Sequence, residues 1–335
     1  MHHTSLFPFL SLLAAPVLGS TTYGCWSEQS NKFHVDCMVA ASAVVMRQTG
    51  NDDQAWIPPS ALSYSWGACT ANIYGKDNGY AVPALNLIAS FEQLGSRCQN
   101  GFFYYDSGYI DAELQGRAGW WRRKTRRSNK PKIAGSHDAA TTWNTTEEIP
   151  HYISPKPDKF PFNVKPVKNG EGQEDKGKNS RLAKRQNGVF VQQVSNGFTT
   201  WSIYRGAQVV AGRHPSAYNL VGEGLNALSA LIDGAIGNNG NELLTQGVDT
   251  TSGSTVNVLA FAVQLGGKYS SWQNLFNSFG DGRTLPRTLL SAALNDWDAA
   301  GFTGGIYHVY DSNLDVVFSI LINGVVGSVD GFPSS

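Results

Sequence analysis

The sequence predicts an α+β protein of two small α/β-sandwich domains, each an antiparallel sheet with helices on one face, joined by a disordered spacer. Three observations predict this class. Strand-like and helix-like patterns alternate within residues 20–121 and again within 186–335. A polar tract rich in Pro and Lys separates these stretches. All four cysteines lie in the first third of the chain, so only the first domain is expected to be disulfide-bonded.

Residues 1–19 (MHHTSLFPFLSLLAAPVLG) have the pattern of a secretory signal peptide that ends at Gly19. Their apolar core, residues 6–18, is shorter than the ~20 residues that a membrane-spanning helix needs. The alternative is a buried N-terminal helix. The later apolar runs at 255–266 and 316–326 are short enough to be buried strands. We therefore expect a secreted, extracellular protein.

The first domain, residues 20–121, is expected to alternate strands and helices. In the helix that begins at Val35, Asp36 can cap the N-terminus, and Val39 and Ala43 belong to an apolar face. Both helices should lie on one face of a small sheet. The expected elements are a strand at 21–26, a helix from 35 that ends at Gly50, a strand over 60–75, a helix over 81–95 with Pro83 in its first turn, and a strand or hairpin over 101–116.

The four cysteines predict two disulfide bonds. An even number of cysteines in a secreted chain favours disulfides. A metal site would need ligand spacings such as CxxC, and the sequence has none. Three pairings are possible, and the spacing alone does not choose among them. The predicted disulfide residues are Cys25, Cys37, Cys69 and Cys98.

Residues 122–185 form a basic insert between two acidic domains. The insert carries sixteen Lys or Arg and seven Asp or Glu, a net charge of +9, whereas residues 21–121 and 186–335 carry −4 and −5. It holds six of the fourteen prolines and no helix or strand period, so we expect it to be disordered or extended. Basic runs can bind nucleic acid or anionic membranes. The acidic flanks and the signal peptide argue against that, and a solvated spacer is expected.

Dibasic pairs stand at both ends of this spacer. Kexin-type Golgi proteases cut such pairs in flexible segments of secreted proteins, because the cleft needs an extended peptide. We expect the spacer to be excised, which makes Gln186 the first residue of a second chain. The only N-x-S/T sequon, at Asn144, lies within the spacer and would carry an exposed glycan. The predicted processing residues are Arg122, Arg123, Arg126, Arg127, Lys184 and Arg185.

The second domain, residues 186–335, has no cysteine and again mixes strands with helices. Its Asn196-Gly197 pair is typical of a tight hairpin turn. The expected elements are a hairpin over 190–212, a helix over 215–237, a strand near 255–265, helices near 270–277 and 286–299, and a closing hairpin over 305–324.

Catalytic motifs are absent from both domains, which contain no GxSxG, HExxH, GxGxxG or P-loop. His214 precedes an expected helix start, where a His-Pro turn explains it, and His308 is expected on the polar face of a strand. The cysteines are assigned to disulfides, which leaves no thiol nucleophile. Paired carboxylates for glycoside hydrolysis need no motif, but nothing singles out Asp106, Asp111 or Glu113. We therefore expect no enzymatic activity and no cofactor or metal.

The organisation over nearly the whole chain resembles the fungal preprotoxins of the two-chain killer-toxin type. The first domain also looks like the fungal killer-toxin and necrosis-inducing-factor effectors. The matching features are an early cysteine, an Asp-Cys pair that opens a helix, a Gly-x-Cys strand and a fourth cysteine after a second helix: Cys25, Asp36-Cys37, Gly67-Ala68-Cys69 and Cys98. The large cysteine-free second domain departs from the one-domain effectors.

This resemblance implies a secreted toxin or effector that acts on competing microbes or host cells, with membrane perturbation as one mode of action. Its expected partners are a kexin-type protease, the two mature chains for each other, and a target-cell receptor or membrane, but no nucleic acid. The chains would associate by packing, and repulsion between their carboxylates should weaken association as pH rises. The alternatives are a secreted hydrolase made as a zymogen and an uncut cell-wall or surface binding protein.

Overall fold

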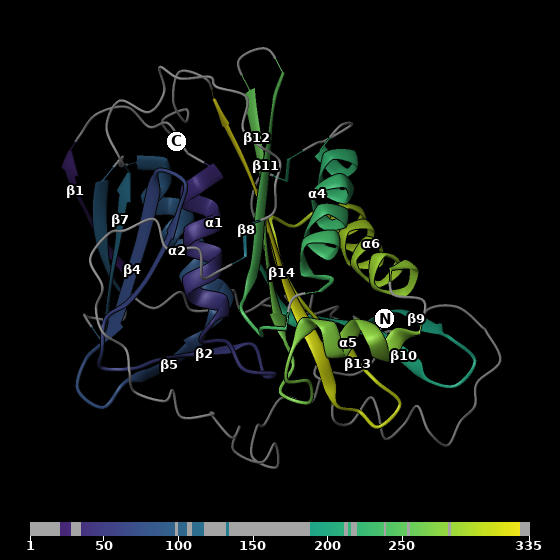
Figure 1. The fold of residues 1–335 in the computed structure, drawn as a ribbon. Coiled ribbons are helices and arrows are strands. Elements are labelled where there is room, and N and C mark those ends of the chain that lie inside the picture. Colours follow the sequence, from purple (N-terminus) through teal and green to yellow (C-terminus); the bar gives the residue numbers. More distant parts are fainter. Residues whose placement is uncertain are drawn as a thin grey trace, which may run out of the picture.

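The computed structural model describes two halves of the chain that pack into four layers. The described residues are 21–27, 35–97, 100–105, 109–116, 132–133, 188–210, 214–215, 220–237, 239–252, 255–280 and 283–328. From left to right, Figure 1 shows a first sheet, the helices α1 and α2, a second sheet and an outer layer of helices. The α+β class with antiparallel sheets is confirmed.

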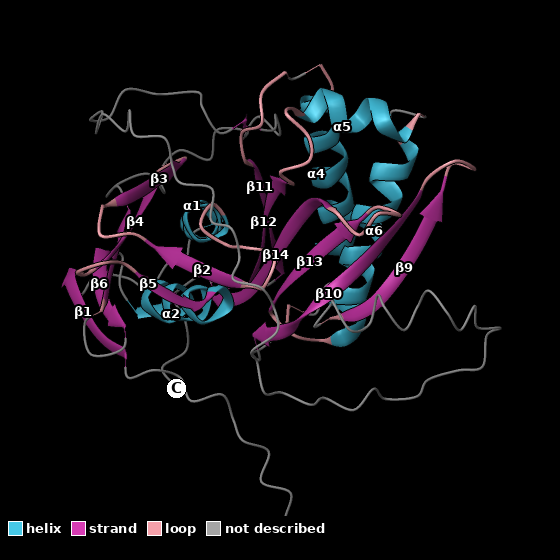
Figure 2. Ribbon diagram, turned by 90° about the horizontal axis from the view of Figure 1, so that it is seen from below, coloured by secondary structure: helices cyan, strands magenta, loops and turns pink. Residues whose placement is uncertain are grey.

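The first half forms a five-stranded antiparallel sheet and a small ribbon. The sheet has the order β1-β6-β7-β4-β3, and β2 pairs with β5 in the ribbon. Helices α1 and α2 both lie on one face of the sheet, as expected (Figure 2). The elements are β1 (Thr21–Ser27), α1 (Val35–Met46), β2 (Gln54–Ile57), β3 (Leu62–Trp66), β4 (Cys69–Gly75), β5 (Tyr80–Pro83), α2 (Ala84–Arg97), β6 (Asn100–Tyr105) and β7 (Ile110–Gly116).

Two local differences from the expected elements have simple causes. The predicted strand over 60–75 is a hairpin of β3 and β4, because Gly67 takes a φ of 54° and turns the chain. Pro83 is the last residue of β5 and α2 begins after it, so Pro83 is not in the first helical turn. The ribbon strands β2 and β5 are only four residues each and were not predicted.

The second half forms a seven-stranded antiparallel sheet with three helices on one face. The strand order is β8-β11-β12-β14-β13-β10-β9. Strand β8 (Lys132–Ile133) lies within the predicted spacer and pairs with β11. The other elements are β9 (Val189–Ser195), β10 (Thr200–Val210), α4 (Leu220–Ala235), β11 (Leu244–Ser252), β12 (Thr255–Leu265), α5 (Trp272–Phe279), α6 (Thr284–Ala300), β13 (Gly304–Tyr310) and β14 (Val316–Ser328).

Both predicted hairpins and all three predicted helices of the second half are present, but strand β11 was not expected. Its sequence LTQGVDTTS has one Gly and few β-branched apolar residues, so its strand pattern is weak. The strand forms because it pairs residue for residue with β12, from Leu244 opposite Val263 to Ser252 opposite Thr255.

Helices cover the seven-stranded sheet on both faces, and the two coverings come from different halves of the chain. Helices α4, α5 and α6 pack on one face, and α1 and α2 of the first half pack on the other (Figure 1). The two helices of the first half are therefore buried between two sheets. This packing, which joins the halves, is the central feature of the fold.

Candidate functional site: the junction between the two halves

An apolar seam joins α1 to the second sheet. Val35, Met38 and Val39 pack against three residues of the seven-stranded sheet, Val258, Ala260 and Val325. The helix approaches strand β11 closely at Gly247, where an added Cβ would lie 2.6 Å from methyl groups of Val35 and Val39. A close fit of this kind has the packing of a protein core rather than of a loose domain contact.

All twelve residues of α1 are buried, whereas a helix that packs against its neighbours on one side only leaves the other side exposed to solvent. The sequence VDCMVAASAVVM carries a single charged residue, Asp36. A helix that is apolar on every side is stable only when it is covered on every side. The predicted apolar face through Val39 and Ala43 was therefore an incomplete description, because the opposite side of the helix is covered too.

A chain of hydrogen bonds crosses the junction beside this seam. Asp53 Oδ1 lies 2.8 Å from Nε2 of His308, and Nδ1 of the same imidazole lies 2.7 Å from Ser319 Oγ. Asp53 belongs to the first half, whereas His308 and Ser319 are cross-strand partners on β13 and β14 of the second. The three residues are only 7 %, 4 % and 7 % exposed. This polar group connects the two halves within an otherwise apolar contact.

The backbone around Asp53 is shaped to place its carboxylate there. Asp53 has a φ of 61°, in the left-handed region that Asp adopts more readily than most residues. The main-chain NH of Ala84 donates to the Asp53 carbonyl at 2.9 Å, which fixes the turn at the start of α2. On the other half, a Cβ at Gly206 would overlap the Asp53 carboxylate, and the pairing register of β10 with β13 shifts just after Arg205. The irregularity in β10 makes room for Asp53.

Asp, His and Ser are the residue types of a hydrolase triad, but this arrangement is buried. A triad needs a serine hydroxyl that a substrate can reach. Ser319 is almost without solvent contact. Its hydroxyl group faces Nδ1 of His308 and Asp53 faces Nε2, whereas in a serine protease the serine faces Nε2 and the aspartate faces Nδ1. The prediction that His308 lies on a polar strand face is wrong, because that face packs against the first half. The geometry supports a structural link rather than catalysis.

A second polar contact across the junction involves Glu92 of α2 and Asn323 of β14. Burial raises the pKa of Glu92 to about 8, although a hydrogen bond from the Asn323 side chain opposes the shift. Asn323 is 1 % exposed, and its Nδ2 also lies 3.8 Å from Met38 Sδ. Glu92 Oε1 has no hydrogen-bond partner within the described residues. A protonated Glu92 therefore suits this site better than a carboxylate.

A third contact joins Tyr64 of β3 to Thr245 of β11, whose hydroxyl groups lie 2.9 Å apart. Both residues are buried, and burial raises the pKa of Tyr64. With the links at His308 and Asn323, this places polar contacts on strands β11, β13 and β14 of the second sheet. Such directional contacts fix the register of two apolar surfaces that could otherwise slide.

The sequence offered a signal for Glu92 but little for Asp53. Glu92 follows Leu85 by seven residues and Ile88 by four, and this spacing places it on a buried side of α2. Asp53 stands in the polar turn Asn51-Asp52-Asp53, where an acidic residue usually faces solvent. Only the packing of the second half brings His308 to it.

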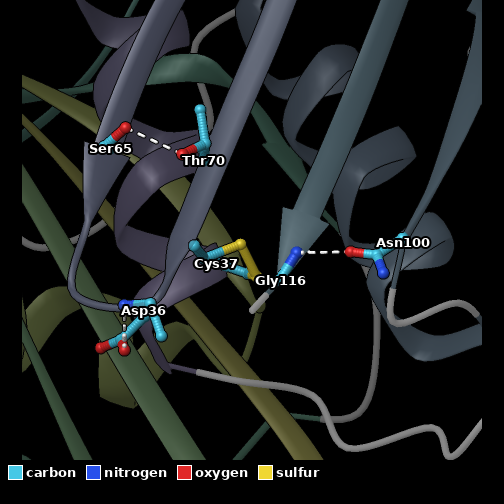
Figure 3. The surroundings of a disulfide bond; sticks show 8 residues. Asp36, Cys37, Ser65, Thr70, Asn100 and Gly116 are labelled. Carbon is cyan, nitrogen blue, oxygen red and sulfur yellow. Dashed lines mark hydrogen bonds between the residues drawn. A yellow bond between two sulfur atoms is a disulfide. The ribbon is translucent and has the colours of Figure 1, made fainter. Parts of the chain in front are cut away.

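Of the predicted disulfide residues, Cys37 and Cys69 are bonded to each other (Figure 3). This bond ties the start of α1 to β4. Beside it, Asp36 Oδ2 accepts a hydrogen bond from the Ala68 main-chain NH at 2.9 Å, and Gly67 leaves space for that carboxylate. The backbone of Cys25 lies in β1, but its side chain and the whole of Cys98 lie outside the described residues.

The other predicted site residues are not at the junction. The six processing residues and Asn144 lie outside the described residues, so their cleavage and glycosylation stay predictions. Nδ1 of His214 donates to the Phe302 carbonyl oxygen at 2.9 Å, and Nε2 lies 3.1 Å from Asp298 Oδ1. Its ring also packs on Trp297, with ring centroids 4.4 Å apart. These contacts give His214 a structural role.

Within the described part of the chain, no group of three or more His, Cys, Asp or Glu side chains could hold a metal ion. None of the helices placed by the structure is both long and apolar enough to cross a membrane.

Comparison with known proteins gives no family. No family model matches the sequence, and no curated protein matches it. The structures that resemble the chain include the tandem DUF26 ectodomains of two Arabidopsis thaliana cysteine-rich receptor-like proteins, PDLP5 and PDLP8. Their sequences are 8 % and 9 % identical to this chain, and each superposes on it with a TM-score of 0.19. Both alignments cover 90 % of this chain, and they cover 97 % of the PDLP5 chain and 96 % of the PDLP8 chain. Scores this low support no argument about fold or function.

Proposed function

We propose that this protein is a secreted, killer-toxin-like protein or effector that works as two non-covalently associated chains. In this proposal, cleavage at the dibasic pairs releases residues 20–121 and 186–335 from the spacer. The chains then act together on competing microbes or on host cells. The sequence organisation suggests this function, and the junction supports it.

One observation carries the proposal: α1 is buried between the two sheets. Two chains that stay together after a cut need a contact like that of an obligate complex, apolar and tightly packed. The apolar seam of α1 has this character, and the links at Asp53 and Tyr64 add directional contacts. A disulfide link between the chains is impossible, because the second half has no cysteine.

The secreted product itself tests the proposal. Mass analysis under non-reducing conditions should find two chains, with Gln186 at the start of the second, and the two should co-elute in size-exclusion chromatography at neutral or acidic pH. The purified pair should then damage sensitive fungal cells or plant tissue. One intact chain that retains residues 128–185 would contradict the two-chain proposal. Co-eluting chains that harm neither target would contradict the toxin assignment alone.

The zymogen alternative rests on the residue types of the Asp53–His308–Ser319 chain. A hydrolase that used it would have to expose Ser319 after processing, by separation of the halves. Ser319→Ala should then abolish a hydrolytic activity of the processed protein. We do not favour this function, because the same hydrogen bonds hold the halves together.

A further inference from the structure

The outer face of the five-stranded sheet is a feature of the first half that the junction does not use. Helices α1 and α2 cover the inner face, and the described residues place no helix or strand over the outer one (Figures 1 and 2). The outward side chains come from alternate positions of β6, β7, β4 and β3. This face points away from the second half, so both surfaces can be occupied at once.

Aromatic rings and polar groups alternate across this face. In one row, Tyr104 of β6, Asp111 of β7 and Tyr74 of β4 are direct cross-strand partners. The next row has Phe102, Glu113 and Asn72 as partners, and the row beyond it has Asn100, Gln115 and Thr70. Tyr104 and Tyr74 are 40 % and 36 % exposed, which is high for tyrosines within a sheet.

The rings are held in place by the strands beneath them, with the Phe102 and Tyr104 planes tilted by 52° to each other. The Phe102 ring lies over Gly24 of β1, where any Cβ would overlap it, so the glycine allows the ring to lie against the strand. The Phe102 and Tyr104 centroids are 5.1 Å apart. The Tyr74 hydroxyl donates to Asp111 Oδ2, and Lys76 Nζ lies 5.9 Å from the Tyr104 ring centroid. Rings fixed in this way lose little entropy when a ligand binds.

Asp111 is a buried acid in the middle of this face. It is 7 % exposed, its Oδ2 accepts a hydrogen bond from the Tyr74 hydroxyl, and its Oδ1 lies 3.8 Å from Lys76 Nζ in an ion pair. These contacts hold the Tyr74 ring and the Lys76 ammonium group in place on the face.

We propose that this face binds a neutral glycan chain. The apolar C–H face of a pyranose ring stacks on an aromatic ring, and its hydroxyl groups donate to carboxylates and exchange hydrogen bonds with amides. Phe102 and Tyr104 on β6 stand two strands from Tyr74 on β4, a separation of about 10 Å, so the two groups of rings would stack on sugar rings that are not directly linked but are separated by one residue of the chain. Asn72 and Gln115 both donate to Glu113 Oε2, and the three side chains offer the polar groups between the rings.

The charge of the face disfavours anionic ligands. Among the described residues of this face, Asp111 and Glu113 outnumber the cation Lys76, so phosphate-rich ligands such as nucleic acid or anionic lipid headgroups would be repelled. The acids between the rings also make the face too polar to lie in a bilayer. A protein partner remains an outcome of the test below.

The test uses the full secreted protein and three neutral glycans: laminarin, yeast mannan and chitohexaose. We expect at least one to bind in calorimetric titration, and Tyr104→Ala and Tyr74→Ala each to weaken that binding about tenfold, the equivalent of ~1.4 kcal/mol. Tyr74→Phe keeps the ring and should stay within about threefold of the wild type. Phe198→Ala is the matched control, because Phe198 is 98 % exposed but lies on the β9–β10 turn of the other half.

Three results would overturn the inference. They are the binding of none of the three glycans, equal binding by the wild type and by Tyr104→Ala, and a loss in Phe198→Ala as large as in Tyr104→Ala. Tyrosine-dependent binding to polygalacturonate, to phosphatidylglycerol vesicles or to a protein in place of the glycans would also overturn it. Far-UV circular dichroism and an intact Cys37–Cys69 bond show that each variant is folded. Because the assay needs no processing, its outcome is independent of the two-chain proposal.

Discussion

Helices α1 and α4 lie on opposite faces of the same sheet, yet their sequences follow different rules. Helix α4 buries one stripe, which includes Gly224, Leu228 and Ile232, and leaves polar residues such as Glu223 in water. Helix α1 buries every residue. The difference follows from what covers each helix, since α4 has solvent behind it and α1 has a second sheet. A helix that has apolar residues on every side in a small domain therefore marks a place where another part of the chain must dock.

A charge placed on each helix gives the sharpest test of this comparison. Val39→Asp puts an unpaired carboxylate between the sheets and should cost about 4 kcal/mol or more, enough to stop the folded protein from accumulating. Asn226→Asp on the exposed side of α4 should change stability by less than about 0.5 kcal/mol. The yield of folded protein and urea unfolding measure both costs, and equal losses in the two variants would refute the contrast.

The disulfide bond gives α1 a second anchor that α4 lacks. Cys37 and Cys69 are 32 residues apart, so replacing both with Ala should cost about 2–4 kcal/mol. Peptide mapping without reduction should find this bond. It should also find a Cys25–Cys98 bond if all four cysteines pair, since only that pair is left. A map with Cys25 bonded to Cys37 would contradict the structure.

Two Asp–His pairs allow the junction to be compared with an exposed contact. Asp53→Ala leaves His308 buried without its acceptor and should cost about 2–3 kcal/mol, and it should weaken the association of the cut chains accordingly. Asp298→Ala removes the partner of His214, but Asp298 is exposed, so the cost should stay below about 1 kcal/mol. Sedimentation of the processed protein reports association. Similar costs for both variants would mean that the buried link contributes little.

Glu92 predicts how the junction responds to pH. Its pKa is about 8 in the folded protein and 4.5 in the unfolded reference, so the folded state holds the proton more tightly. Its stabilising contribution is complete below pH 4.5 and is lost as pH rises through 8. At about 1.4 kcal/mol per pKa unit, the loss is a few kcal/mol at most. Carboxylate repulsion was the expected cause of such weakening, and the structure adds the burial of one carboxyl group.

The Glu92→Gln variant separates these causes. The amide keeps a hydrogen-bonding group at the site but does not titrate, so association measured at pH 4.5 and 7.5 should differ much less than in the wild type. Glu223→Gln on the exposed side of α4 is the control and should keep the wild-type pH dependence. An unchanged pH dependence in Glu92→Gln would assign the effect to other groups.

The sequence by itself determined most of the local structure. Hydrophobic period, Gly and Pro positions and the Asn196-Gly197 turn are local signals, and they placed the helices, the two hairpins of the second half and the α+β class. The even number of cysteines favoured disulfides, of which Cys37–Cys69 is described. Strands β2, β5 and β11 were not predicted, because they are short or have a weak strand pattern and form by pairing with neighbouring strands.

Only the tertiary structure decided which buried surfaces meet. The apolar pattern of α1 shows that it must be covered, but not that β11, β12 and β14 cover it. The contact between Asp53 and His308 joins residues 255 positions apart, and a polar side chain carries no local mark of such a partner. Whether an acid such as Glu92 or Asp111 is buried depends on the elements around it, because burial is a property of the packed assembly and not of the residue.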